Sequence, residues 1–133
     1  MDTTLPSVLI IDNDSRNIFA LSLILKTKGY RCLTAPDVQT CMQLLRENKD
    51  IGIVLMDMMM PELDGYEALG LLKKDRSFAH LPVVAVTAQA MPGDREKCLA
   101  AGADAYVSKP VDVDLMLSIL KQYLQASYGD PSE

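Results

Sequence analysis

The sequence predicts a doubly wound α/β fold with a five-stranded parallel sheet. Five short apolar runs typical of buried strands recur along the chain, at residues 7–12, 30–35, 51–57, 81–87 and 104–109. Segments with helical spacing separate them, and this strict alternation is typical of a parallel sheet covered by helices on both faces. The 133 residues suit a single domain, because they can build one continuous core but not two.

The individual elements follow in order from local patterns. The runs VLII and IGIVLM are apolar at almost every position, as expected of central strands that are buried on both sides. The helical segments each show one apolar face. Its members are Ile18, Leu21 and Leu25 after the first strand, Val38, Cys41, Met42 and Leu45 after the second, and Val113, Leu117, Leu120 and Leu124 after the fifth. Gly29 and Gly102 follow helices, where glycine commonly forms the turn.

Composition and charge argue against several classes of protein. A formal net charge of -5 disfavours nucleic-acid binding, which needs clustered Lys and Arg. Three cysteines without the close pairs of a zinc or redox motif indicate core residues in a reducing compartment. No basic N-terminal region precedes a long apolar stretch, and no apolar run approaches a membrane span. We therefore expect a cytoplasmic protein that binds neither nucleic acid nor membrane, with one domain over residues 5–127 and a polar tail over residues 128–133.

Acidic residues end two of the predicted strands. In open parallel sheets, ligands bind beyond the carboxyl ends of the strands, where the strand order reverses. The expected order 2-1-3-4-5, that of flavodoxin-like folds, makes the first and third strands neighbours and places Asp12 beside Asp57. Two crowded carboxylates repel each other unless a cation lies between them. Oxygen ligands with no histidine or cysteine nearby favour Mg²⁺ over zinc.

The ends of the other strands complete the predicted site. Lys109 can offer a positive charge to a phosphoryl group, and Thr87 can donate a hydroxyl. The second strand ends in Ala35 and contributes nothing polar, as expected of an edge strand. Asp14 precedes a helical segment and is interpreted as its N-cap, in preference to a metal ligand.

Four motifs, VLIIDND, IVLMDMMMPELDGYEAL, VVAVTA and DAYVSKP, closely resemble those of the receiver domains of two-component response regulators. The stretch TAQAMPGDREKCLAAGADAYVSKP is most similar to receivers attached to hybrid histidine kinases. The resemblance implies that Asp57 accepts a phosphoryl group from a histidine kinase or a histidine phosphotransfer protein in a Mg²⁺-dependent reaction. It implies a signalling switch with a downstream protein target, which promotes only its own phosphorylation and dephosphorylation and is not a conventional enzyme.

The resemblance also implies a metal site at Asp12, Asn13, Asp57 and the main-chain carbonyl of Met59. Most family members have two adjacent acids after the first strand, whereas the second position here is Asn13. An amide oxygen can still bind Mg²⁺, but the loss of one charge should lower the affinity for the metal. With Met59 in place of a carboxylate or amide that could orient water, we expect slow loss of the phosphoryl group.

Further roles are implied for the residues around the phosphoryl group. Lys109 should contact it, and Thr87 should move to bond it while the ring of Tyr106 follows. The bond between Lys109 and Pro110 should be cis, which suits proline at a tight junction.

Three other functions compete with this interpretation. A pseudo-receiver that binds a partner without phosphorylation is suggested by Asn13. A haloacid-dehalogenase-type phosphatase would need an acid two residues after the nucleophile, where Met59 stands. A flavin- or nucleotide-binding module would need a glycine-rich turn after the first strand, which the sequence lacks.

Overall fold

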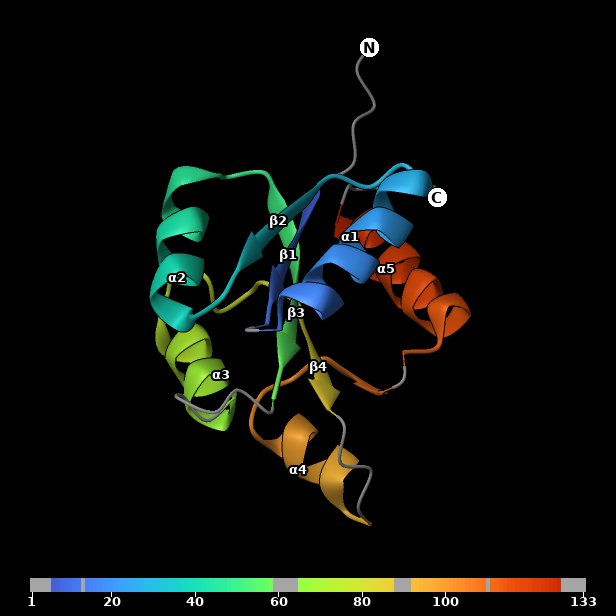
Figure 1. Ribbon diagram of the computed structural model, residues 1–133. Helices are drawn as coiled ribbons and strands as arrows, with labels where there is room; N and C mark the ends of the chain where they lie inside the picture. The colour runs from blue at the N-terminus through green and yellow to red at the C-terminus, as the bar shows by residue number, and fades with distance from the viewer. Residues whose placement is uncertain (1–5, 13, 59–64, 88–91, 110, 128–133) are drawn as a thin grey trace.

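The computed structural model describes residues 6–12, 14–58, 65–87, 92–109 and 111–127, and within them five strands and five helices alternate (Figure 1). The strands are β1 (Ser7–Ile11), β2 (Cys32–Ala35), β3 (Ile51–Asp57), β4 (Val83–Thr87) and β5 (Ala105–Ser108). The helices are α1 (Ser15–Thr27), α2 (Val38–Glu47), α3 (Gly65–Lys74), α4 (Asp94–Ala100) and α5 (Val113–Ser127). The predicted tail, residues 128–133, lies outside the described residues.

The strands form one parallel sheet in the order β2-β1-β3-β4-β5. The predicted fold class and strand order are therefore confirmed. β3 pairs with both β1 and β4, so its carboxyl end lies between the ends of two neighbouring strands. Because all strands run in the same direction, the residues at their carboxyl ends gather along one edge of the sheet.

Two strands, β2 and β4, begin two residues later than their apolar runs predicted, and β5 begins one residue later. The N–H of Tyr30 donates to the carbonyl of Leu25, which closes the turn after α1 and keeps Tyr30 out of β2. Gly29 adopts a φ of 92° in this turn, a conformation that favours glycine. β4 begins at Val83, directly after Pro82, which has no N–H to donate to a neighbouring strand.

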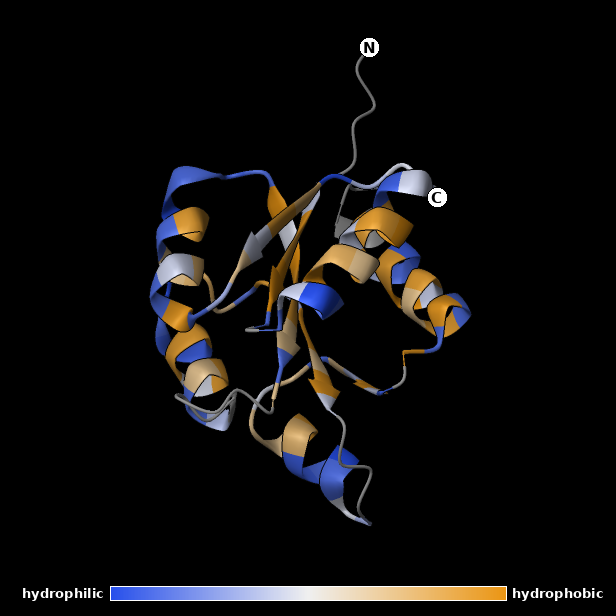
Figure 2. Cartoon of the chain, in the orientation of Figure 1, coloured by the Kyte–Doolittle hydropathy of each residue, from blue (hydrophilic) through white to orange (hydrophobic). Residues whose placement is uncertain are grey.

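Each face of the sheet is covered by its own set of helices (Figure 1). Successive residues of a strand point to opposite faces, so each central strand contributes to both cores. In the core beneath α2, α3 and α4 lie Leu9, Ile11, Val54, Met56, Val83 and Ala85, and in the core beneath α1 and α5 lie Val8, Ile10, Ile53, Leu55, Val84 and Val86. In Figure 2 the middle of the sheet is largely hydrophobic, whereas the helices show more hydrophilic residues.

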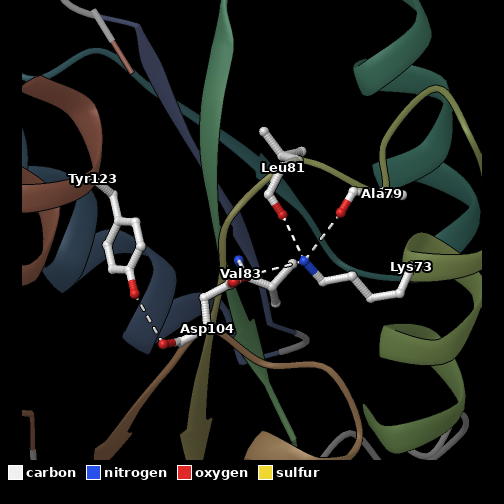
Figure 3. A network of polar contacts seen from close by, with 6 residues as sticks. All are labelled: Lys73, Ala79, Leu81, Val83, Asp104 and Tyr123. Carbon is white, nitrogen blue, oxygen red and sulfur yellow. Dashed lines mark hydrogen bonds and ion pairs between the residues drawn. The ribbon is translucent and has the colours of Figure 1, made fainter. Parts of the chain in front are cut away.

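A polar network ties the elements together at the amino end of β4 (Figure 3). The ammonium of Lys73, from α3, donates to the carbonyl of Leu81 at 2.9 Å and to the carboxylate of Asp104 at 3.0 Å. That carboxylate also accepts from the N–H of Val83 at 2.9 Å. The hydroxyl of Tyr123, from α5, donates to the carbonyl of Asp104 at 2.9 Å. We call these five residues the Lys73–Asp104 network.

None of the helices in the described part of the chain is long and apolar enough to cross a membrane. The three cysteines are free; Cys41 and Cys98 are buried and Cys32 is half-buried.

Candidate functional site

Among the described residues, three polar side chains are buried at the carboxyl edge of the sheet. Asp12 directly follows β1, Asp57 ends β3 and Thr87 ends β4, and they are only 3%, 5% and 2% exposed. Buried charges in an otherwise apolar sheet are costly unless they are paired. Their position together at the strand ends, as the sequence predicted, marks this edge as the candidate site.

The carboxylate of Asp12 is oriented by the start of α1. Its Oδ1 accepts a hydrogen bond of 2.8 Å from the N–H of Asp14. The carboxylate of Asp14 accepts in turn from the N–H of Arg16 at 3.0 Å, which confirms Asp14 as the N-cap of α1. One oxygen of Asp12 is thus engaged by the backbone, while Oδ2 lies nearest to Lys109.

Lys109 reaches both carboxylates from the end of β5. Its Nζ lies 3.7 Å from Oδ2 of Asp12 and 3.6 Å from Oδ2 of Asp57. The N–H of Lys109 donates to the carbonyl of Thr87 at 2.8 Å, which fixes its backbone against β4. The side chain of Lys109 is 22% exposed, so its ammonium can meet a ligand that arrives from solvent.

The site carries more negative than positive charge. The pKa of Asp12 is raised, first because burial disfavours its charged form and also because Asp57 lies close to it. The N–H of Asp14 and the ammonium of Lys109 act in the opposite direction but do not reverse the shift. Two carboxylates against one ammonium, with oxygen donors only, are suited to a hard divalent cation such as Mg²⁺.

The described residues include no group of three or more His, Cys, Asp or Glu side chains that could hold a metal.

A hollow of about 230 Å³ adjoins the site. Asp12, Asn17 and Lys109 line it together with apolar residues of α1 and of the segment that leads into α5. The carboxylate of Asp12 can therefore be approached between α1 and the segment that leads into α5.

Three of the predicted positions, Asn13, Met59 and Pro110, lie outside the described residues. Tyr106 is half-buried on β5, and its hydroxyl donates to Asp94 of α4 at 3.0 Å. The sequence patterns did not point to Asp94, because a carboxylate at the start of a helix is common and its tyrosine partners come from other elements.

Comparison with known proteins shows which family has this arrangement. Residues 8–121 match the response regulator receiver domain family. The polar-differentiation response regulator DivK of Brucella anthropi is 35% identical over 118 residues, which cover 89% of this chain and 95% of the relative.

Solved structures share the fold. The receiver domain of the Francisella response regulator 1452 superposes with a TM-score of 0.83 at 24% identity, covering 92% of this chain and 98% of that one. The receiver domain of the Saccharomyces cerevisiae response regulator Ssk1, crystallised with the histidine phosphotransfer protein Ypd1, gives a TM-score of 0.80 at 24% identity, with 93% of each chain covered. With its five parallel strands, its acidic pair at the strand ends and this match over most of its length, the chain belongs to the response regulator receiver domain family.

Proposed function

We propose that Asp57 is the phosphoacceptor of a phosphorylation-dependent signalling switch. The observation that carries this proposal is the position of its buried carboxylate at the end of β3, beside Asp12 and 3.6 Å from the ammonium of Lys109. A carboxylate in this position is a nucleophile with a positive charge ready to meet the oxygens of an incoming phosphoryl group.

The donor in this proposal is a phosphohistidine of a histidine kinase or of a histidine phosphotransfer protein. The bond between phosphorus and the histidine nitrogen breaks and a bond to an oxygen of Asp57 forms, while the histidine keeps the electron pair. The likeness to a receiver that was crystallised with a phosphotransfer protein supports a donor of this class. Because such a transfer depends mainly on alignment and charge neutralisation, Lys109 and Thr87 are assigned to the oxygens of the phosphoryl group.

Asp12, Asp57, Asn13 and the main-chain carbonyl of Met59 would hold Mg²⁺, which would neutralise the charge of the transferred group. Oδ2 of Asp12, which no backbone group is shown to hold and which faces Lys109 across 3.7 Å, and the excess of carboxylate over ammonium among the described residues support a cation at this place. The protein would promote its own phosphorylation and dephosphorylation only, and would then present a changed surface to a downstream protein.

The test is covalent labelling with a small-molecule phosphodonor and Mg²⁺, followed by intact mass. The wild-type chain should gain one phosphoryl group, and Asp57→Asn should gain none. Asp50→Asn is a matched control, because Asp50 directly precedes the other end of the same strand and should leave labelling unchanged. A full adduct on Asp57→Asn would refute the assignment, and an unlabelled wild type would favour a pseudo-receiver, the alternative that Asn13 suggests.

Asn13 gives a separate prediction about the metal. Asn13→Asp should tighten Mg²⁺ binding to the unphosphorylated protein by about tenfold, roughly 1.4 kcal/mol, because a third carboxylate adds charge to the site. Titration with Mg²⁺ followed by amide chemical shifts measures both affinities. Equal affinities would mean that residue 13 is not a metal ligand.

A further inference from the structure

One carboxylate outside the acceptor site is shared by two tyrosines. Oδ1 of Asp94, the first residue of α4, accepts from the hydroxyl of Tyr66 at 3.2 Å, and Oδ2 accepts from the hydroxyl of Tyr106 at 3.0 Å. Tyr66 belongs to α3 and Tyr106 to β5, so one side chain joins three elements. The hydroxyl of Tyr66 also lies 3.5 Å from the sulfur of Cys98, and the ammonium of Lys97 lies 4.6 Å from the centre of the Tyr66 ring.

Each of the three residues is close in the chain to a different part of the acceptor site. Tyr66 lies in the first turn of α3, the helix that follows Asp57. Asp94 begins the helix that follows Thr87. Tyr106 stands on β5, the strand that leads to Lys109. The shared carboxylate thus connects α3, which follows Asp57, and α4, which follows Thr87, with β5, which leads to Lys109.

The start of α4 depends on these polar contacts because apolar burial holds it weakly. α4 is seven residues long, its N-cap Gly93 makes no side-chain capping bond, and Cys98 is its one buried residue. Hydrogen bonds to a charged acceptor are about twice as strong as those between neutral groups. Burial raises the pKa of both tyrosines; the Cys98 sulfur and the Asp94 carboxylate raise that of Tyr66 further, and Asp94 raises that of Tyr106, so both hydroxyls remain donors at neutral pH.

We propose that Asp94 is a positioning residue that couples Tyr66 to Tyr106 and holds Tyr106 in its resting orientation. Any movement of the Tyr106 ring that carries its hydroxyl away from α4 must break the bond to Asp94 and leave Tyr66 as the remaining partner. The start of α4 and the first turn of α3 then lose their common anchor to β5, while the bond between Asp94 and Tyr66 still joins the two helices. The regulatory part of this inference, that phosphorylation at Asp57 works against the anchor, rests on the proposed function.

The coupling is tested without any phosphodonor, on the full unphosphorylated chain, by the aromatic NMR signals of the tyrosines. Tyr66→Phe should shift the ring signals of Tyr106, and the same substitution should have no effect on them in an Asp94→Ala background. Tyr106→Phe should likewise shift the ring signals of Tyr66 in the wild-type background and leave them unchanged in the Asp94→Ala background. Unchanged signals in the wild-type background, or equal changes in both backgrounds, would overturn the coupling through Asp94.

The regulatory part is tested by the affinity for beryllofluoride, a phosphoryl mimic, in the presence of Mg²⁺. Asp94→Ala should bind it about fivefold more tightly, which corresponds to about 1 kcal/mol, because the anchor no longer opposes the change. Glu96→Ala is the matched control, because Glu96 is an exposed acid in the same first turn of α4 and should leave the affinity unchanged.

These outcomes separate the two proposals. Equal affinities of wild type and Asp94→Ala would refute the regulatory role of Asp94 but not the phosphoacceptor. Failure of the wild type to bind beryllofluoride would count against the proposed function and its regulatory extension, while the tyrosine signals would still decide the coupling.

Discussion

Asp12 uses its two oxygens differently, and this bears on what the proposed acceptor site could bind. Oδ1 is held by the N–H of Asp14 at 2.8 Å, so the carboxylate cannot rotate freely. Oδ2 lies 3.7 Å from Lys109, a distance at which the charges attract without a direct hydrogen bond. The residue is therefore placed for a ligand that would lie between the carboxylates, at the expense of stability when no cation is bound.

Asp12→Asn should stabilise the metal-free protein. The substitution removes a buried charge that faces Asp57, and we expect a rise in the thermal midpoint on the order of 3 °C at pH 7, about 1 kcal/mol for a domain of this size. The folded pKa of Asp12 is raised above 3.8, so the wild type loses stability as the pH rises from that value through the folded pKa. The advantage of the variant should accordingly vanish below pH 3.8.

Thermal unfolding of both proteins at several pH values measures this difference. Saturating Mg²⁺ provides the control, because the bound cation should stabilise the wild type more than the variant and reduce the gap. A variant that is less stable than the wild type at neutral pH without metal would contradict the repulsion described here.

At the scale of the elements, polar side chains gather at both edges of the sheet. Those at the carboxyl edge form the candidate site, and those at the amino end of β4 stabilise the fold. The carboxyl edge holds the buried acids Asp12 and Asp57 with the ammonium of Lys109 within 4 Å of both. At the amino end of β4 the Lys73–Asp104 network satisfies the backbone of Leu81 and Val83 and joins α3 to α5 (Figure 3). The stem of Lys73 also covers Gly102, where φ is 118° and an added Cβ would lie 3.0 Å from Cγ of Lys73.

Lys73→Met should weaken the fold without altering the acceptor site. Methionine keeps the apolar stem over Gly102 but removes the donor to Leu81 and Asp104, and we expect the free energy of unfolding to fall by about 1 kcal/mol, given the partial exposure of the ion pair. Lys74→Met is the control, because Lys74 is the exposed neighbour in the same helix. Urea unfolding measures both, and equal losses in the two variants would show that the network contributes nothing specific.

At the scale of the whole molecule, the side chains that the proposed switch would use lie on β4, on β5 and directly after β5. Thr87 and Lys109 are joined through the backbone, and Tyr106 on β5 is joined through Asp94 to α4 and α3. A charge added at Asp57 would act first on Thr87 and Lys109, because these groups flank the end of β3. Its consequences should then spread along β4, α4 and β5.

Beryllofluoride with Mg²⁺ should therefore change the amide chemical shifts mainly in residues 87–110. The physical reason is the new negative charge, which draws hydroxyl and ammonium groups toward Asp57 and disturbs the strands that bear them. A two-dimensional amide spectrum before and after addition measures this, with Asp57→Asn as the control. Shifts that stay confined to the loops around Asp12 and Asp57 would mean that the chain has no switch of this kind.

The sequence by itself determined the number of strands, their order and the meeting of Asp12, Asp57, Thr87 and Lys109 at one edge. Strands that are apolar on both sides are typical of a parallel sheet covered by helices on both faces. The carboxyl ends of parallel strands lie at one edge of the sheet, whatever the details of packing. The sequence also correctly identified Asp14 as the N-cap of α1, because capping depends on a bond between residues that are neighbours in the chain.

The tertiary structure alone decided which polar groups meet across elements. The sharing of Asp94 by Tyr66 and Tyr106 and the reach of Lys73 to Asp104 join residues that no local spacing connects. Hydrophobic periodicity states which face of an element is buried, but it does not state which side chain of another element will lie opposite. Such partners depend on how the helices dock on the sheet, and that is fixed only when the two cores pack together.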